Sequence, residues 1–214
     1  MNITPNFAVP IIETRHPDPD GLNRRLRDLV LAREGPDIEP AQAVPTLKYR
    51  VFESHFRFFA WTEPCVQELR QYVIGNLVQA VKALSGYTDG QMARLRVHNH
   101  TWFHITRSGG YASSHNHPMA SWSSVYCIDG GDQDGVDNPD SGILRFADTN
   151  PTGSVFLDPG NMHLKRPFNH GSINYRLEPG QLLIFPSWLM HEVTPYQGKR
   201  ERITVASNFW FSED

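Results

Sequence analysis

The sequence has little that would place the protein outside the cell or in a membrane. Only two of its 214 residues are cysteines, Cys65 and Cys127, and they do not form a Cys-x-x-Cys motif, so we expect two buried thiols in a reducing compartment. The first 21 residues lack the charged start and continuous apolar stretch of a secretory signal. No apolar run approaches the ~18 residues needed to cross a bilayer. These absences predict a soluble, cytoplasmic protein with no membrane partner.

An excess of positive charge is missing as well. Lys and Arg total 20, Asp and Glu total 23, and the formal net charge is −3. Proteins that bind nucleic-acid phosphates usually carry a basic excess, so we expect no nucleic-acid partner. The Gly-x-Ser-x-Gly elbow and the glycine-rich nucleotide motifs are also absent, which argues against those enzyme classes. A chain of this length can bury one core, and we predict a single domain over residues 1–214.

Helical periodicity is confined to the first 90 residues. One helix is predicted over residues 20–35, with Asp20 as a candidate cap, Gly35 as the stop and one apolar face formed by Leu22, Leu26, Leu29 and Val30. A second is predicted from Pro64 to Gly86, where apolar residues recur every three or four positions, at Val66, Leu69, Val73, Leu77, Val81 and Leu84. Both helices should pack against a sheet through these faces.

From about Gln91 the pattern changes to short runs rich in β-branched and aromatic residues, separated by clusters of Gly, Pro, Asn and Asp. The candidate strands are 93–106, 121–128, 142–147, 153–157, 173–177, 181–186, 190–194 and 201–211. They predict a mainly β jelly roll over residues 91–214, with the helical part, residues 1–90, packed on one outer face. His98, His100 and His104 share one face of the first strand, either as a polar lining or on the exposed side.

Two histidines separated by one residue precede a proline in the segment HNHP, residues 115–118. In an extended segment residues i and i+2 point to the same side, so His115 and His117 could both bind one metal ion. A third ligand should come from another strand, and His191, which follows the buried run QLLIFP, fits that role. The alternatives are a histidine-rich surface turn for the pair and a hydrogen-bonded core residue for His191.

The last predicted strand places an arginine inside the barrel. Arg200, Arg202, Thr204, Ala206 and Asn208 share one face of residues 201–211 and the turn before it, and the opposite face is largely apolar. An arginine in a barrel interior costs several kcal/mol unless an anion compensates it, and a guanidinium suits a carboxylate. We therefore expect a carboxylate ligand near the metal, with an internal ion pair as the alternative.

Three segments together resemble a known family: GGYASSHNHPMASWSSVY, then SGILRFAD, then PGQLLIFPSWLMHEVTPYQGKRERITVASNFW, which span residues 109–210. This order of motifs is similar to the iron(II)- and 2-oxoglutarate-dependent oxygenases, in their prolyl-hydroxylase-like branch, which includes a functionally unassigned bacterial group. The resemblance implies a double-stranded β-helix that binds Fe(II), 2-oxoglutarate and dioxygen. It also implies that 2-oxoglutarate is converted to succinate and carbon dioxide while a small-molecule or peptide substrate is hydroxylated; nothing in the sequence identifies that substrate.

The resemblance also assigns residues. His115 and His191 match the two histidine ligands of the family, and Arg202 with Thr204 matches its Arg-x-Ser/Thr pattern for binding 2-oxoglutarate. Arg200 is a less favoured substitute for Arg202 on the same face. Tyr126 lies on the strand after the ligand pair, where relatives often place a further contact to 2-oxoglutarate.

One position departs from the family. His117 stands where most members have a carboxylate. If it binds the metal, three neutral imidazoles leave the site one unit more positive, which strengthens binding of a dianion. If it does not, it lies beside the ligands and water takes its position. Halogenating members replace the carboxylate with a small residue, so a histidine here disfavours halogenation.

Two other functions remain open. A cupin-like metalloenzyme with three histidines would need no 2-oxoglutarate, but cupins carry a glutamate where Ser121 and Trp122 lie here. A non-catalytic ligand-binding barrel would use the same histidines only as hydrogen-bonding residues. The sequence leaves the oligomeric state open.

Overall fold

A computed structural model describes residues 1–40, 46–132, 137–149 and 156–213. Its helical elements are α1 (Pro19–Arg33), η1 (Pro36–Ile38), η2 (Phe58–Ala60), α2 (Pro64–Ser85) and α3 (Asp89–Met92). Its strands are β1 (Ile12–Arg15), β2 (Lys48–Glu53), β3 (Leu95–His115), β4 (Trp122–Asp129), β5 (Leu144–Phe146), β6 (Ile173–Tyr175), β7 (Gln181–Pro186), β8 (His191–Val193) and β9 (Arg202–Glu213). The described part of the chain is therefore mainly β, as the sequence predicts.

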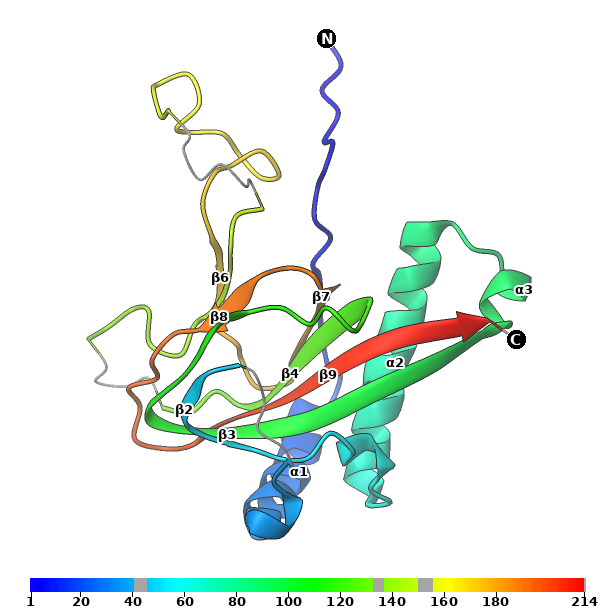
Figure 1. Ribbon diagram of the computed structural model, residues 1–214, viewed down its shortest axis with the longest axis vertical. Helices are drawn as coiled ribbons and strands as arrows, with labels where there is room; N and C mark the ends of the chain where they lie inside the picture. Colours follow the sequence, from blue (N-terminus) through cyan, green and yellow to red (C-terminus); the bar gives the residue numbers. More distant parts are fainter. Residues whose placement is uncertain (41–45, 133–136, 150–155, 214) are drawn as a thin grey trace.

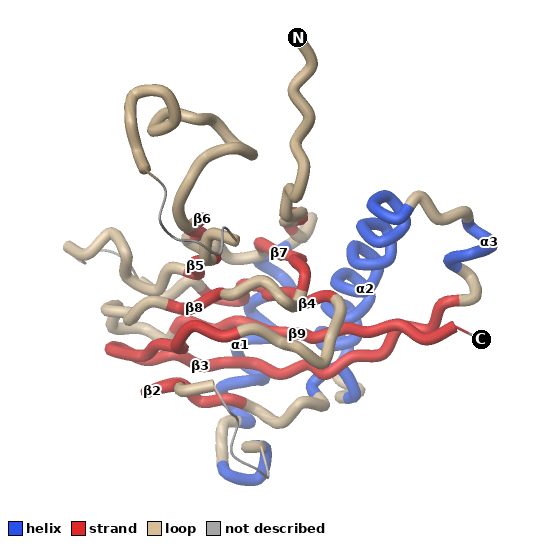
Figure 2. Tube along the Cα trace, turned by 45° about the horizontal axis from the view of Figure 1, so that its top comes forward, coloured by secondary structure: helices blue, strands red, loops and turns tan. Residues whose placement is uncertain are grey.

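The strands form one antiparallel sheet in the order β1-β7-β4-β9-β3-β8-β5-β6, and β2 also pairs with β3. The long strand β3 connects two parts of this sheet, because its first half pairs with β9 and its last residues pair with β8. Figures 1 and 2 show β3 and β9 running side by side as the longest strands, and in Figure 2 β4 to β8 lie above this pair while β2 lies below β3. This curled sheet positions the candidate site on its concave side.

Both long helices lie on one face of the sheet (Figures 1 and 2). Their apolar residues form one core with the strand residues of the same face, including Leu26, Leu69, Phe103, Tyr126 and Val205. A smaller apolar cluster occupies the other face and includes Cys127, Leu144, Phe146, Leu183 and Phe185. Strand alternation explains the division, since neighbouring residues such as Tyr126 and Cys127 point to opposite faces. The predicted packing of the helices on one outer face is confirmed.

The helix boundaries differ slightly from prediction at α1 and agree at α2. Asp18, not Asp20, caps α1 by accepting a hydrogen bond from the Gly21 N–H, and Glu34 rather than Gly35 is the C-terminal cap. The helix begins one residue earlier than predicted because Pro19 is suited to the first helical turn. Gly86 ends α2 with φ 66°, in the left-handed conformation that favours glycine.

Most predicted strands are present, but β1 and β2 lie in the N-terminal 90 residues that were expected to be helical. β2 is not predicted from the sequence because its alternation of side chains between the two faces is interrupted. Arg50 has φ 51°, and the register with β3 shifts between Tyr49 and Val51. β3 continues beyond the predicted end at residue 106 to reach His115. The predicted strand 153–157 falls mostly outside the described residues. Among the described helices, none combines the length and apolarity needed to cross a membrane.

Candidate metal centre

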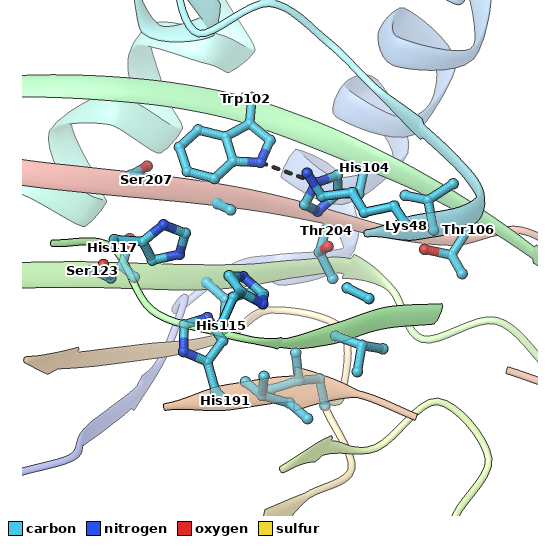
Figure 3. A pocket seen from close by; sticks show the side chains of 18 of the residues that line it. Lys48, Trp102, His104, Thr106, His115, His117, Ser123, His191, Thr204 and Ser207 are labelled. Carbon is cyan, nitrogen blue, oxygen red and sulfur yellow. Dashed lines mark hydrogen bonds between the residues drawn. The ribbon is translucent and has the colours of Figure 1, made fainter. Parts of the chain in front are cut away.

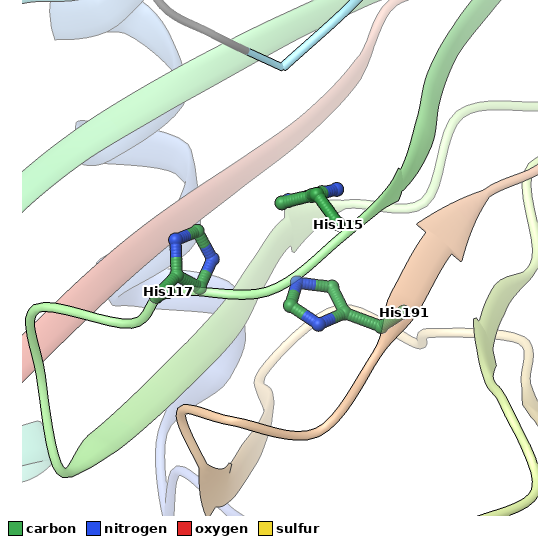
Figure 4. Close-up of side chains that lie close together, drawn as sticks. All are labelled: His115, His117 and His191. Carbon is green, nitrogen blue, oxygen red and sulfur yellow. The ribbon is translucent and has the colours of Figure 1, made fainter. Parts of the chain in front are cut away.

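Three histidines converge on the concave side of the sheet. His115 ends β3, His117 follows in the adjoining turn, and His191 begins β8 (Figure 4). The pairing of β3 with β8 sets His115 directly opposite His191, and their ring centroids are 4.4 Å apart. The His117 ring lies 5.1 Å from that of His115 and 5.2 Å from that of His191. One ligand atom from each histidine lies within 4.8 Å of the others, which makes the three residues a candidate ligand set for one metal ion.

Hydrogen bonds fix the orientation of two of these rings. The Nδ1 atom of His115 lies 2.7 Å from the Ser113 carbonyl, and that of His191 lies 2.8 Å from the Leu189 carbonyl. Because a carbonyl only accepts, each Nδ1 carries the proton and each Nε2 keeps a free lone pair. This pattern of backbone support is typical of histidine ligands to metals.

His117 is held through its backbone. Its N–H donates to the Ser187 carbonyl at 2.9 Å, and its ring contacts Trp102 edge-on at 5.8 Å between centroids. Its ring makes no hydrogen bond to any described residue, so either nitrogen is available to a ligand.

Burial keeps all three imidazoles neutral at neutral pH. It lowers the pKa of His115, and it lowers the pKa of His191 to about 4, helped by the nearby His115. Burial followed by the charges of the other two histidines lowers the pKa of His117 to about 3. Neutral imidazole is the form that binds metals such as Fe, Zn, Cu and Ni, so the chemistry of the donor set fits a divalent transition metal.

A buried arginine faces the same space. Arg202 begins β9, is 3% exposed and lines a cavity together with the three histidines and Thr204, which we call the inner cavity. Figure 3 shows the three histidines and Thr204 around this cavity. No carboxylate of the described residues forms an ion pair with Arg202. Burial lowers its pKa, yet a guanidinium stays charged in proteins. Gly142 lies close to Arg202 and has φ 63°, a backbone conformation that favours glycine. A Cβ atom at this position would lie 3.0 Å from the Tyr196 ring and 3.4 Å from the Arg202 side chain.

The structure does not bring Tyr126 or Arg200 to the inner cavity. Tyr126 points to the helical face, where its hydroxyl donates to the Asn23 side-chain oxygen at 2.7 Å, and its buried hydroxyl has a raised pKa. Arg200 precedes β9, and its exposed side chain donates to the Gly131 carbonyl and lies 3.6 Å from Asp129. Of these two candidate arginines, only Arg202 lines the inner cavity.

Sequence-based reasoning missed several lining residues. Lys48 and Glu53 come from β2, whose order the sequence did not reveal, and Trp102 comes from β3. His104 also belongs to the lining, so that part of the histidine face of β3 is a polar lining. His98 instead stacks on Trp210 at 5.7 Å and has an exposed hydrogen bond with Ser212. Alternation along β3 was the available signal for His104, but nothing local predicted β2.

The fold is that of the double-stranded β-helix class, and three of its histidines form a candidate metal centre. Residues 100–208, just over half of the chain, match the model of the family described as "Putative 2OG-Fe(II) oxygenase". The chain belongs to this family of 2-oxoglutarate- and iron(II)-dependent oxygenases. It is therefore an oxidoreductase, and the family implies Fe(II) and 2-oxoglutarate as cofactor and cosubstrate. The comparison with curated proteins found no match.

Solved structures support the fold at low sequence identity. A Pseudomonas putida prolyl-4-hydroxylase is 20% identical with a TM-score of 0.55, covering 93% of this chain and 91% of its own. A Trichoplax adhaerens prolyl hydroxylase in complex with a hypoxia inducible factor peptide fragment is 11% identical, with a TM-score of 0.55 and coverage of 96% and 84%. HygX from Streptomyces hygroscopicus, with nickel, 2-oxoglutarate and hygromycin B bound, is 10% identical, with a TM-score of 0.54 and coverage of 94% and 83%. These likenesses confirm the double-stranded β-helix fold.

Proposed function

We propose that the protein hydroxylates a small-molecule or peptide substrate, with Fe(II) bound by His115, His117 and His191 and with 2-oxoglutarate bound by Arg202 and Thr204. One observation carries the proposal. A buried guanidinium without a carboxylate partner among the described residues lines the same cavity as three neutral imidazoles. A buried, unpaired charge is costly, and a carboxylate ligand that supplies the missing partner removes that cost.

Each protein group has a distinct task in this proposal. Iron and 2-oxoglutarate, when bound, supply the oxidation, in which dioxygen is consumed, 2-oxoglutarate becomes succinate and carbon dioxide, and one oxygen atom goes to the substrate. The Arg202 guanidinium grips the far carboxylate with parallel hydrogen bonds, and the buried Thr204 hydroxyl adds a donor two residues along β9. The Nδ1 hydrogen bonds of His115 and His191 hold their rings in place, so that little reorganisation is needed on metal binding.

His117 sets the charge of the proposed site. Three neutral imidazoles leave the full double charge of the metal uncompensated by the protein, whereas a carboxylate ligand would cancel one unit. The site then attracts the dianionic cosubstrate more strongly. Arg202 adds a further positive charge to the inner cavity, whereas the charge of Lys48 is balanced by its ion pair with Glu53.

The three-histidine set also suits a cupin-like metalloenzyme that does not use 2-oxoglutarate. The test is anaerobic reconstitution with Fe(II), followed by addition of 2-oxoglutarate and measurement of the visible spectrum. A charge-transfer band with one iron per chain is expected for the oxygenase. Iron uptake without a band would favour the cupin-like enzyme, and no iron uptake would favour a non-catalytic barrel.

A further inference from the structure

The first residues of β3 have an unpaired edge. β2 and the segment after it pair with β3 only from Thr101 onward, where the Thr101 N–H donates to the Phe56 carbonyl at 3.1 Å. Residues 95–100 pair with β9 alone among the described strands, and Figures 1 and 2 show this part of β3 extending past β2. Backbone groups alternate between the two edges of a strand, so those of Val97 and Asn99 point away from β9, as those of Thr101 do. On that side the described residues offer them no hydrogen-bond partner, which leaves an edge that another strand can join.

A positively charged pocket adjoins this edge. It has a volume of about 660 Å³ and is lined by two arginines, Arg57 and Arg70, and by Asn99, but by no acidic residue; we call it the arginine pocket. Both arginines are exposed, and neither forms an ion pair with a described carboxylate. Arg70 donates only to the amide oxygen of Gln67 at 3.2 Å. Two guanidiniums without an anionic partner, next to a free strand edge, favour a negatively charged ligand.

The arginine pocket continues into a second cavity beside the candidate metal ligands. This outer cavity has a volume of about 580 Å³, and its wall includes Trp102, His115 and His117. Phe56 and His100 line both spaces, with their rings stacked at 6.0 Å between centroids. Together the two spaces exceed the roughly 300–1,000 Å³ of a small-molecule pocket. A ligand that fills both is therefore longer than a typical small molecule, and an extended peptide has the required length.

We propose that the arginine pocket binds an extended peptide segment of the substrate, which adds a strand to the free edge of β3 and places an acidic side chain against Arg57 and Arg70. Main-chain hydrogen bonds to Val97 and Asn99 supply affinity that does not depend on the peptide sequence, and the arginines select the charge. The neighbouring part of the same peptide then enters the outer cavity, next to the candidate metal centre. This inference rests on the proposed function in that the peptide is taken to be the substrate, whereas binding to the edge itself requires neither metal nor 2-oxoglutarate.

Charge selection is tested with three blocked peptides that differ only in two side chains: acetyl-TVEVET-amide, acetyl-TVQVQT-amide and acetyl-TVKVKT-amide. They are titrated by NMR into isotope-labelled protein loaded with Zn(II) and 2-oxoglutarate, and in parallel into metal-free protein. We expect the glutamate peptide to bind about tenfold more tightly than the glutamine peptide, in keeping with two exposed ion pairs, and the lysine peptide to bind most weakly. The amide signals of Val97 and Asn99 should shift on binding.

Substitution of the arginines should remove this selection. Arg57→Gln and Arg70→Gln should each reduce the preference for glutamate over glutamine about threefold, and the double variant should bind the two peptides equally. Arg24→Gln is the matched control, because Arg24 is an exposed arginine on α1 that lies outside the arginine pocket, and it should keep the wild-type preference.

Strand addition is tested by N-methylation of the glutamate peptide. Successive N–H groups of a strand point to opposite edges, so methylation of alternate residues blocks one edge at a time. Of two peptides methylated at the odd or at the even positions, one should lose affinity at least tenfold and the other should bind nearly as before. Asn99→Pro should weaken binding from the side of the protein by removing an N–H at the free edge, and Asn99→Ala, which keeps that N–H, is its control.

Equal binding of the glutamate and glutamine peptides by the wild type, or no binding of any of the three, would overturn the inference. A preference for glutamate that persists in the double arginine variant would do the same, as would an equal effect of the two methylation patterns, because the peptide would then not pair with the edge. Failure of the proposed function has a different signature. In that case wild-type protein shows no iron–2-oxoglutarate band, while the preference for the glutamate peptide persists in the metal-free titrations.

Discussion

Replacing Arg202 with methionine removes a buried positive charge that has no carboxylate partner among the described residues. Methionine has a similar reach and no charge, so the change tests the guanidinium rather than the volume of the side chain. If Arg202 grips the far carboxylate of 2-oxoglutarate, its loss leaves that carboxylate buried without a partner, at a cost of about 3 kcal/mol. The expected result is an increase of about a hundredfold in the Kd of 2-oxoglutarate.

The same substitution should stabilise the ligand-free protein. An unpaired buried charge opposes folding, and apolar replacement of buried charged groups has stabilised other proteins by about 1–4 kcal/mol. For a domain of this size a gain of about 2 kcal/mol raises Tm by about 4–8 °C. Added 2-oxoglutarate should raise Tm of the metal-loaded wild type but not of Arg202→Met, since a ligand stabilises only the state that binds it.

Calorimetric titration with 2-oxoglutarate and thermal unfolding with and without it measure both effects. Arg200→Met is the matched control because Arg200 is exposed and lies outside the inner cavity, so it should leave affinity and Tm nearly unchanged. A structural arginine would behave in the opposite way, with lower Tm and unaltered affinity in Arg202→Met. That outcome, or a loss of affinity in Arg200→Met alone, would refute the assignment of Arg202.

Three further predictions concern the histidines and the charged pair beside them. His191→Ala should abolish stoichiometric iron binding, because only His115 and His117 remain, and metal analysis showing one iron per chain would contradict that role. His117→Asp should retain iron if His117 is a direct ligand, and His117→Ala should then weaken it strongly; unaltered affinity in His117→Ala would instead place His117 beside the metal. Contacts with His104 and Lys48 outweigh burial and lower the pKa of Glu53 from 4.5 to about 2, so these contacts stabilise the fold fully above pH 4.5 and are lost as the pH falls through about 2. The stability advantage of wild type over Glu53→Gln should therefore shrink between these values in acid unfolding experiments, and a constant difference would be inconsistent with an ionised Glu53.

Local patterns in the sequence were sufficient for much of the fold. The apolar repeat of α2 and its terminal Gly86 predicted that helix closely, because helix periodicity and capping depend on residues only a few positions apart. Alternation along β9 predicted that Ile203 and Val205 face the helices while Arg202 and Thr204 face the interior. The histidine pair, the later histidine and this alternation were enough to suggest a metal site with an anion-binding arginine.

Only the tertiary structure decided which residues complete the site. Arg200 falls outside because β9 begins at Arg202, and Tyr126 falls outside because its strand turns that residue toward the helices. Lys48 and Glu53 enter through β2, whose bulge at Arg50 hides the strand period. Pairing between distant strands sets which side chains share a cavity, and that pairing depends on contacts between segments about 50 to 120 residues apart, which local periodicity does not encode.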